Sequence, residues 1–140
     1  MLTNPVFDWI MDLDREYAVT ICVGGGTQIN EAFRQAGLPI REFGPLGRPT
    51  VTEEERQLAR RVLEQNQAIV QKRLVALGVD ANVVIPAFEI GRVFCHLNGD
   101  QYLLAAYHGF YILYAVTALE RLENKSEQFA LYPKIHVVGF

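Results

Sequence analysis

The sequence predicts an α/β protein, a three-layer sandwich in which helices cover both faces of a mainly parallel sheet. Two observations support this fold class. Apolar, β-branched runs that are typical of short buried strands recur at residues 17–23, 82–85, 92–97, 111–117 and 134–140. Segments with helical periodicity separate most of these runs, at residues 4–13, 27–36, 52–77 and 100–108, and strands that alternate with helices favour a parallel sheet.

The first two helices have recognisable start and stop signals. Asn4 followed by Pro5 is typical of a capping residue and a first helical turn, so a short helix begins there. The first strand, over residues 17–23, leads into three glycines and then directly into the helix over residues 27–36. Gly37 favours the left-handed backbone that ends this second helix.

The longest helix is predicted from a capping box, in which the Thr52 hydroxyl accepts from first-turn amides while Glu55 reaches back. Apolar residues recur at helical spacing as far as Leu77, and Gly78 ends the run. Its wide apolar face suggests that part of this helix meets a second subunit. We therefore expect a homo-oligomer, most simply a dimer, formed through this helix or through the tyrosine-rich residues 102–114.

Composition limits the class of protein. The 140 residues fit a single domain, residues 1–140, and the net charge of −3 provides no basic surface for nucleic acid. Neither a signal peptide nor an apolar membrane span is present in the sequence, so no membrane partner is expected. Cys22 and Cys95 lie in apolar runs without metal-ligand spacing, which predicts buried free thiols, no metal site and a cytoplasmic location.

Gly24, Gly25 and Gly26 are the candidate binding motif. They stand between a predicted strand and a predicted helix, and without side chains they let a ligand approach the backbone closely. Amides at the start of a helix can then point at negative charge, so the turn predicts a phosphate or other anion site. A plain strand-to-helix turn is the simpler alternative, because such turns also use glycine.

Three segments resemble the amino-acid-kinase superfamily, and acetylglutamate kinase most closely, with uridylate kinase next. The stretch V-G-G-G-T-Q-I-N at residues 23–30 is similar to the family's V-H-G-G-G-P-Q-I-N. Residues 51–54 resemble the start of the family's long helix, and L-N-G-D-Q at residues 97–101 is similar to its V-N-A-D-Q. The matches keep the family's order over about residues 16–118, and they imply an amino-acid-kinase-like fold.

The resemblance implies phosphoryl transfer from ATP, with Mg, to a small carboxylate or phosphate. In this family the glycines matching Gly24–Gly26 hold the transferring phosphoryl group, and the aspartate matching Asp100 organises the catalytic lysines. A transition state with charge spread over equatorial oxygens needs such positioned donors and cations. Asp100 can equally be a helix N-cap.

Four residues are the candidates for substrate binding: Asn30, Arg48, His96 and Asn98. Thr50 stands where the family has its substrate arginine, so Arg48 is a substitute for it, although a loop arginine is more often solvated. His96 stands where the family has an asparagine that contacts substrate. A histidine in a strand is also more often structural than catalytic.

The departures from the family concern its cations. The family's lysine-bearing first strand has no counterpart in this sequence, and Lys72, Lys125 and Lys134 lie outside the matching motifs. The leading hypothesis is therefore a degenerate or shortened family member that binds an anionic or nucleotide-like small ligand at the glycine turn. The alternatives are an active ATP-dependent kinase and a non-enzymatic structural or regulatory interaction protein.

Overall fold

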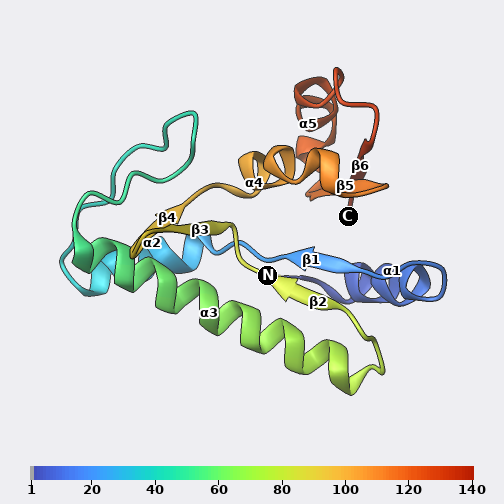
Figure 1. Cartoon of the computed structure of the whole chain (residues 1–140), viewed down its shortest axis with the longest axis horizontal. Coiled ribbons are helices and arrows are strands. Elements are labelled where there is room, and N and C mark those ends of the chain that lie inside the picture. The colour runs from blue at the N-terminus through green and yellow to red at the C-terminus, as the bar shows by residue number, and fades with distance from the viewer. Residues whose placement is uncertain (1) are drawn as a thin grey trace. The chain divides into compact units, whose positions relative to one another are not determined.

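A computed structural model describes residues 2–140 and confirms an α/β protein (Figure 1). The chain divides into two compact units, Met1–Gly99 (unit 1) and Asp100–Phe140 (unit 2). Within the described residues the strands form three two-stranded sheets, two of them parallel and one antiparallel. The single domain expected from chain length stays a prediction, and each unit is considered separately below.

Unit 1 begins with a helix, and two consecutive helices precede its last strands. Its elements are α1 (Asn4–Asp14), β1 (Thr20–Cys22), α2 (Gly26–Gln35), α3 (Glu53–Ala76), β2 (Asn82–Val84), β3 (Ala87–Ile90) and β4 (Val93–His96). β1 pairs with β2 in parallel, with Ile21 opposite Val83. β3 and β4 form an antiparallel hairpin that turns at Gly91, whose φ is 62°. The sequence pattern missed β3, because the strand is only four residues long and Pro86 separates it from the apolar run before it.

The predicted boundaries of α1, α2 and α3 are confirmed to within one or two residues. Gly37 follows α2 with a φ of 69°, a left-handed conformation that glycine adopts without strain. Thr52 caps α3, since its Oγ1 accepts from Glu55 N at 3.1 Å. Glu55 in turn accepts from the backbone of Thr52, as expected of a capping box, and also from Val51 N at 2.9 Å, one residue before the cap.

The core of unit 1 lies between α2, α3 and β4. The cluster of buried residues there consists of Ile29, Phe33, Ala59, Val62, Leu63 and Phe94, and further buried apolar residues lie on α1, the later turns of α3 and the β2 segment. Further along α3, next to its buried face, Gln67 donates to Val83 O at 2.6 Å and Gln71 donates to Ala81 O at 3.1 Å. These glutamines satisfy carbonyl groups of the β2 segment that β1 leaves unpaired, which lets a sheet of two strands end there.

Unit 2 contains the remaining strands. Its elements are α4 (Gly99–Ala105), which starts one residue before the unit boundary, the 3-10 helix η1 (Tyr107–Gly109), β5 (Leu113–Thr117), the 3-10 helix η2 (Leu119–Arg121), α5 (Leu122–Gln128) and β6 (Ile135–Gly139). β5 and β6 are parallel, with Tyr114 opposite His136. Their buried side chains pack on Phe129. The helix expected over residues 100–108 ends early and continues as η1.

None of the helices in residues 2–140 combines the length and apolar character needed to cross a membrane. The two cysteines are free thiols, as expected, but the expectation that both are buried is wrong, because Cys22 is exposed and Cys95 is half-buried. β1 is only three residues long, with its first and third residues exposed, and Cys22 is the third.

Candidate anion site

The three glycines connect β1 to α2, and their roles differ. Gly25 is buried, and a Cβ added there would lie 2.8 Å from Asn66 Nδ2 and 3.4 Å from a Leu63 methyl carbon. Gly25 therefore lets α2 pack closely on α3. Gly24 and Gly26 are exposed, and a Cβ at either position would meet no atom within 4 Å. Their open sides leave the approach to the backbone that an anion site requires.

The N-terminus of α2 is held in place but carries no side-chain cap. The side-chain amide of Asn66, in α3, donates to Gly24 O at 3.2 Å and holds the turn against that helix. Gly25 is the N-cap residue and cannot supply a capping oxygen, so the first-turn amides of α2 keep their partial positive charge.

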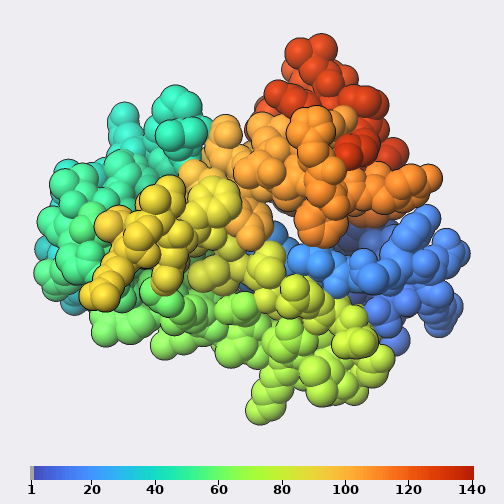
Figure 2. Space-filling model, viewed as in Figure 1, coloured from blue at the N-terminus to red at the C-terminus, as the bar shows by residue number. Residues whose placement is uncertain are grey.

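Arg48 brings a full positive charge to this turn. Its Nη2 donates to Gly26 O at 3.0 Å, and only 4% of the residue is exposed. The guanidinium lies between two rings, 5.4 Å from the centre of Phe33 and 4.7 Å from the centre of Phe43. The interpretation of Arg48 as a solvated loop residue is therefore wrong. The segment that carries it joins α2 to α3 at the surface of unit 1 (Figure 2).

Two of the three guanidinium nitrogens, Nε and Nη1, are buried without a hydrogen-bond partner. Burial lowers the pKa of Arg48 from its ordinary value, but an arginine remains charged at neutral pH. A buried charge normally acquires a partner, because the cost of removing it from water is large. The arrangement therefore has unused donors and unbalanced positive charge.

Asn30 borders the same carbonyl group. Asn30 follows Gly26 by four positions, so it lies one helical turn further along α2 on the same face. Its backbone amide donates to the Gly26 carbonyl, as in any α-helix. Phe33 lies on this face as well, so Asn30 stands between the two contacts that Arg48 makes with α2. Its Oδ1 is also buried without a partner.

His96 and Asn98 reach the site from the end of β4. Burial, followed by the charge of Arg48, lowers the pKa of His96 to about 4, so its imidazole is neutral at pH 7. Its Nδ1 is buried without a hydrogen-bond partner. The backbone amide of Asn98 donates to Leu46 O at 3.4 Å. This hydrogen bond holds the loop that carries Arg48 against the end of β4. Unit 1 thus brings together all the predicted residues except Asp100.

Gly47 is the residue that permits this close approach. Its φ is 110°, and a Cβ there would lie 2.6 Å from Asn98 N. Any other residue would strain the backbone and push the loop away from β4. Sequence reasoning missed Gly47, together with the rings of Phe33 and Phe43, because nothing in the local pattern indicates that these residues meet.

A second buried charge in unit 1 shows how the fold normally treats such groups. Glu55 is 1% exposed, and its carboxylate accepts from Arg41 at 3.1 Å and from Val51 N at 2.9 Å. The hydrogen bond from Arg41 is the main cause that lowers its pKa. Both carboxylate oxygens are used, whereas the guanidinium of Arg48 has one bonded nitrogen and two unbonded ones.

Asp100, the predicted catalytic residue, belongs to unit 2. It lies in the first turn of α4, inside the helix rather than at the N-cap position. Its Oδ2 accepts from Lys125 Nζ at 2.5 Å and from Gln128 at 3.1 Å, so the carboxylate joins α4 to α5. The third lysine of interest, Lys134, donates to Phe110 O at 2.8 Å.

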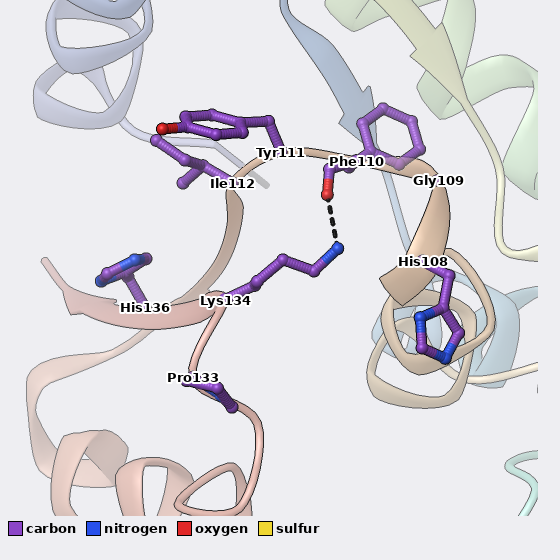
Figure 3. Close-up of a pocket in the computed structure, with 8 residues that line it drawn as sticks. All are labelled: His108, Gly109, Phe110, Tyr111, Ile112, Pro133, Lys134 and His136. Atoms are coloured by element: carbon purple, nitrogen blue, oxygen red, sulfur yellow. Dashed lines mark hydrogen bonds between the residues drawn. The ribbon is translucent and has the colours of Figure 1, made fainter.

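Unit 2 also contains an open cleft of about 670 Å³ that the sequence did not predict. It is lined by His108, Gly109, Phe110, Tyr111, Ile112, Pro133, Lys134 and His136 (Figure 3). The Lys134 side chain crosses from one wall to the Phe110 carbonyl, and its ammonium lies 4.7 Å from the centre of the Tyr107 ring. The ammonium group of Lys134 is thus already bound to groups of the protein itself, the Phe110 carbonyl and the Tyr107 ring.

No family model, curated protein or solved structure matches this chain. No group of three or more His, Cys, Asp or Glu side chains in the part of the chain described is arranged to hold a metal ion. The case for a function therefore depends on the geometry of the site itself.

Proposed function

We propose that unit 1 binds a small anionic ligand at the junction of the Gly24–Gly26 turn and Arg48. The observation that carries this proposal is the Arg48 guanidinium, buried beside the N-terminus of α2 with Nε and Nη1 unpartnered. An anion would accept from these donors, and the exposed backbone of Gly24 and Gly26 offers it room. The partial charge of the helix would add to the attraction.

This proposal also includes the finer fold, an amino-acid-kinase-like three-layer sandwich, and the family's phosphoryl chemistry. The open sides of Gly24 and Gly26 leave room for a phosphoryl group, and the family resemblance implies that of ATP. ATP bound with Mg would supply a transferable phosphoryl group. The leading hypothesis remains binding without robust turnover, because unit 1 has one lysine, Lys72, which is exposed about 9 Å further along α3 than Asn66.

The test is calorimetric titration of the whole protein with inorganic phosphate, ATP and a small carboxylate. Arg48→Met keeps most of the side-chain volume but removes the charge, and should weaken binding of these anions by about 100-fold. Arg34→Met is the matched control, since Arg34 lies on the exposed side of α2, paired with Glu31 at 2.6 Å. Equal losses in both variants, or no binding by the unchanged protein, would reject the proposal.

An ATP-dependent kinase is the second candidate, and one observation favours it. Arg48 places a cation against the glycine turn, where a kinase of this family needs one. Transfer of phosphate from ATP to acetylglutamate, another small carboxylate or UMP at an ordinary enzymatic rate would establish this candidate over simple binding. Arg48→Met should then abolish the transfer.

A further inference from the structure

The unsatisfied groups of the site have both polarities. Arg48 offers donors at Nε and Nη1, whereas Asn30 offers an acceptor, Oδ1, and all three atoms are buried without partners. Arg48 donates to the Gly26 carbonyl, and Asn30 follows Gly26 by one turn on the same face of α2, so its side chain leans back toward that carbonyl. An anion that carries only acceptor atoms would satisfy Arg48 and leave Asn30 unmet.

From this inventory we infer that the site selects anions that carry a hydrogen-bond donor of their own, such as an O–H on the atom bearing the charged oxygens or beside it. The inference rests on the proposed anion site and names the class of its ligand. Hydrogen phosphate and 2-hydroxycarboxylates belong to this class, whereas sulfate and simple carboxylates do not. The ligand accepts from Arg48 and donates to Asn30 Oδ1.

His96 is compatible with such a ligand. Its imidazole is neutral at pH 7, and its Nδ1 is buried without a hydrogen-bond partner. A neutral imidazole nitrogen donates or accepts according to its tautomer, so it adapts to a second polar atom of the ligand. Arg48 is thus the charged group that balances the anion, while Asn30 supplies the discrimination.

The size of the preference follows from the cost of a buried acceptor that has lost its water and gained no partner. Such a group disfavours the wrong ligand by a factor of about 10 to 100. Sulfate also lacks the proton that lets phosphate donate, although the two ions have nearly the same size and shape. The comparison of these two ions therefore isolates the hydrogen bond.

The experiment measures dissociation constants of the whole protein for four anions at pH 7.5: phosphate against sulfate, and 2-hydroxypropanoate against propanoate. The first pair tests an inorganic or phosphoryl ligand and the second pair tests a carboxylate ligand. We expect a preference of about 10-fold or more for the hydroxyl-bearing ion in at least one pair. Asn30→Leu, which keeps the branching and number of heavy atoms of the asparagine side chain, should reduce that preference to within about 3-fold.

Two variants control this result. Asn30→Ala removes the same acceptor with a smaller side chain, and should behave as Asn30→Leu does if either variant packs poorly. Gln35→Leu removes an amide that lies on the exposed surface of α2, bonded to Glu31, and should leave the preference unchanged. Equal affinity for both ions of each pair, or a preference that survives both Asn30 substitutions, would overturn the inference while leaving the anion site intact. Absence of any anion binding would reject the proposed function as well.

Discussion

Arg48 in unit 1 and Asp100 in unit 2 are both charged residues that the sequence predicted to act in the site, but their surroundings are opposite. Asp100 is paired with Lys125 at 2.5 Å and bonded to Gln128, so its carboxylate joins two helices of the same unit. Arg48 is more deeply buried and has one hydrogen bond, to a neutral carbonyl. An ion pair whose groups are hydrogen-bonded within the protein is explained by its structural role, whereas a buried charge with unbonded donors is explained by a ligand that binds to it.

The largest effect is expected when the loop that carries Arg48 is moved away from β4. Gly47→Ala puts a Cβ 2.6 Å from Asn98 N at a φ of 110°. We expect a loss of about 2 to 3 kcal/mol in the free energy of unfolding, measured by urea denaturation, and loss of anion binding. Gly44→Ala is the matched control in the same loop, because its Cβ would meet only Gly47 O, at 4.0 Å. If Gly47→Ala binds anions normally, the loop does not position Arg48.

The second prediction concerns pH and sharpens the role of the buried positive charge. The pKa of His96 is about 4 in the folded protein and 6.5 for an ordinary histidine, so the unfolded chain binds more protons between these values. The contribution of His96 to stability is therefore complete above about pH 6.5 and is lost as the pH falls toward 4. Because the side chain is partly exposed, we expect a loss of about 1 to 2 kcal/mol rather than the full linkage value.

An NMR titration of the histidine rings provides the measurement. The resonance that disappears in His96→Asn should titrate near pH 4 in the free protein. Bound phosphate would offset the charge of Arg48, and we expect it to move this midpoint upward. A midpoint near 6.5 in the free protein, unchanged by phosphate, would contradict the placement of His96 beside Arg48.

The smallest expected effect is at the paired carboxylate. Asp100→Asn and Lys125→Met each remove a partly exposed ion pair, so thermal unfolding should show a loss of about 1 kcal/mol or less. If phosphate binds to Arg48 and the Gly24–Gly26 turn, neither variant should change the affinity of unit 1 for phosphate by more than about 2-fold. A large loss of phosphate affinity in Asp100→Asn would place that residue in the site after all.

The sequence predicted the local part of this site and missed the part that depends on distant residues. The strand, the glycine turn and the helix that follows were all readable, because β-branched runs, glycines and caps act within a few positions. The burial of Arg48 could not be predicted from the sequence, because it depends on three residues outside its local pattern. These are Phe43 and Phe33, whose rings contact the guanidinium, and Gly47, whose left-handed backbone lies close to the end of β4.

The fold shows the same division. Local signals predicted the bounds of α1, α2 and α3 closely, but the expected cap is confirmed only for α3, at Thr52. Asn4 is the first residue inside α1 rather than its N-cap, which is Thr3 and makes no side-chain capping bond. β3 was missed because it is only four residues long and Pro86 separates it from the apolar run before it. The separation of the strands into three sheets depends on pairing between distant segments, and the Asp100–Lys125 pair joins residues 25 positions apart. Neither feature leaves a mark in the local sequence.

The most direct test of the account is the thermal unfolding midpoint of the unchanged protein and of Arg48→Met, each with and without saturating phosphate. A buried charge kept for a ligand costs stability, so Arg48→Met should unfold at the same or a higher temperature without phosphate and should gain nothing from it. The unchanged protein should gain several degrees with phosphate. If instead Arg48→Met unfolds about 5 °C lower and phosphate stabilises neither protein, Arg48 is a structural contact between rings and the anion site does not exist.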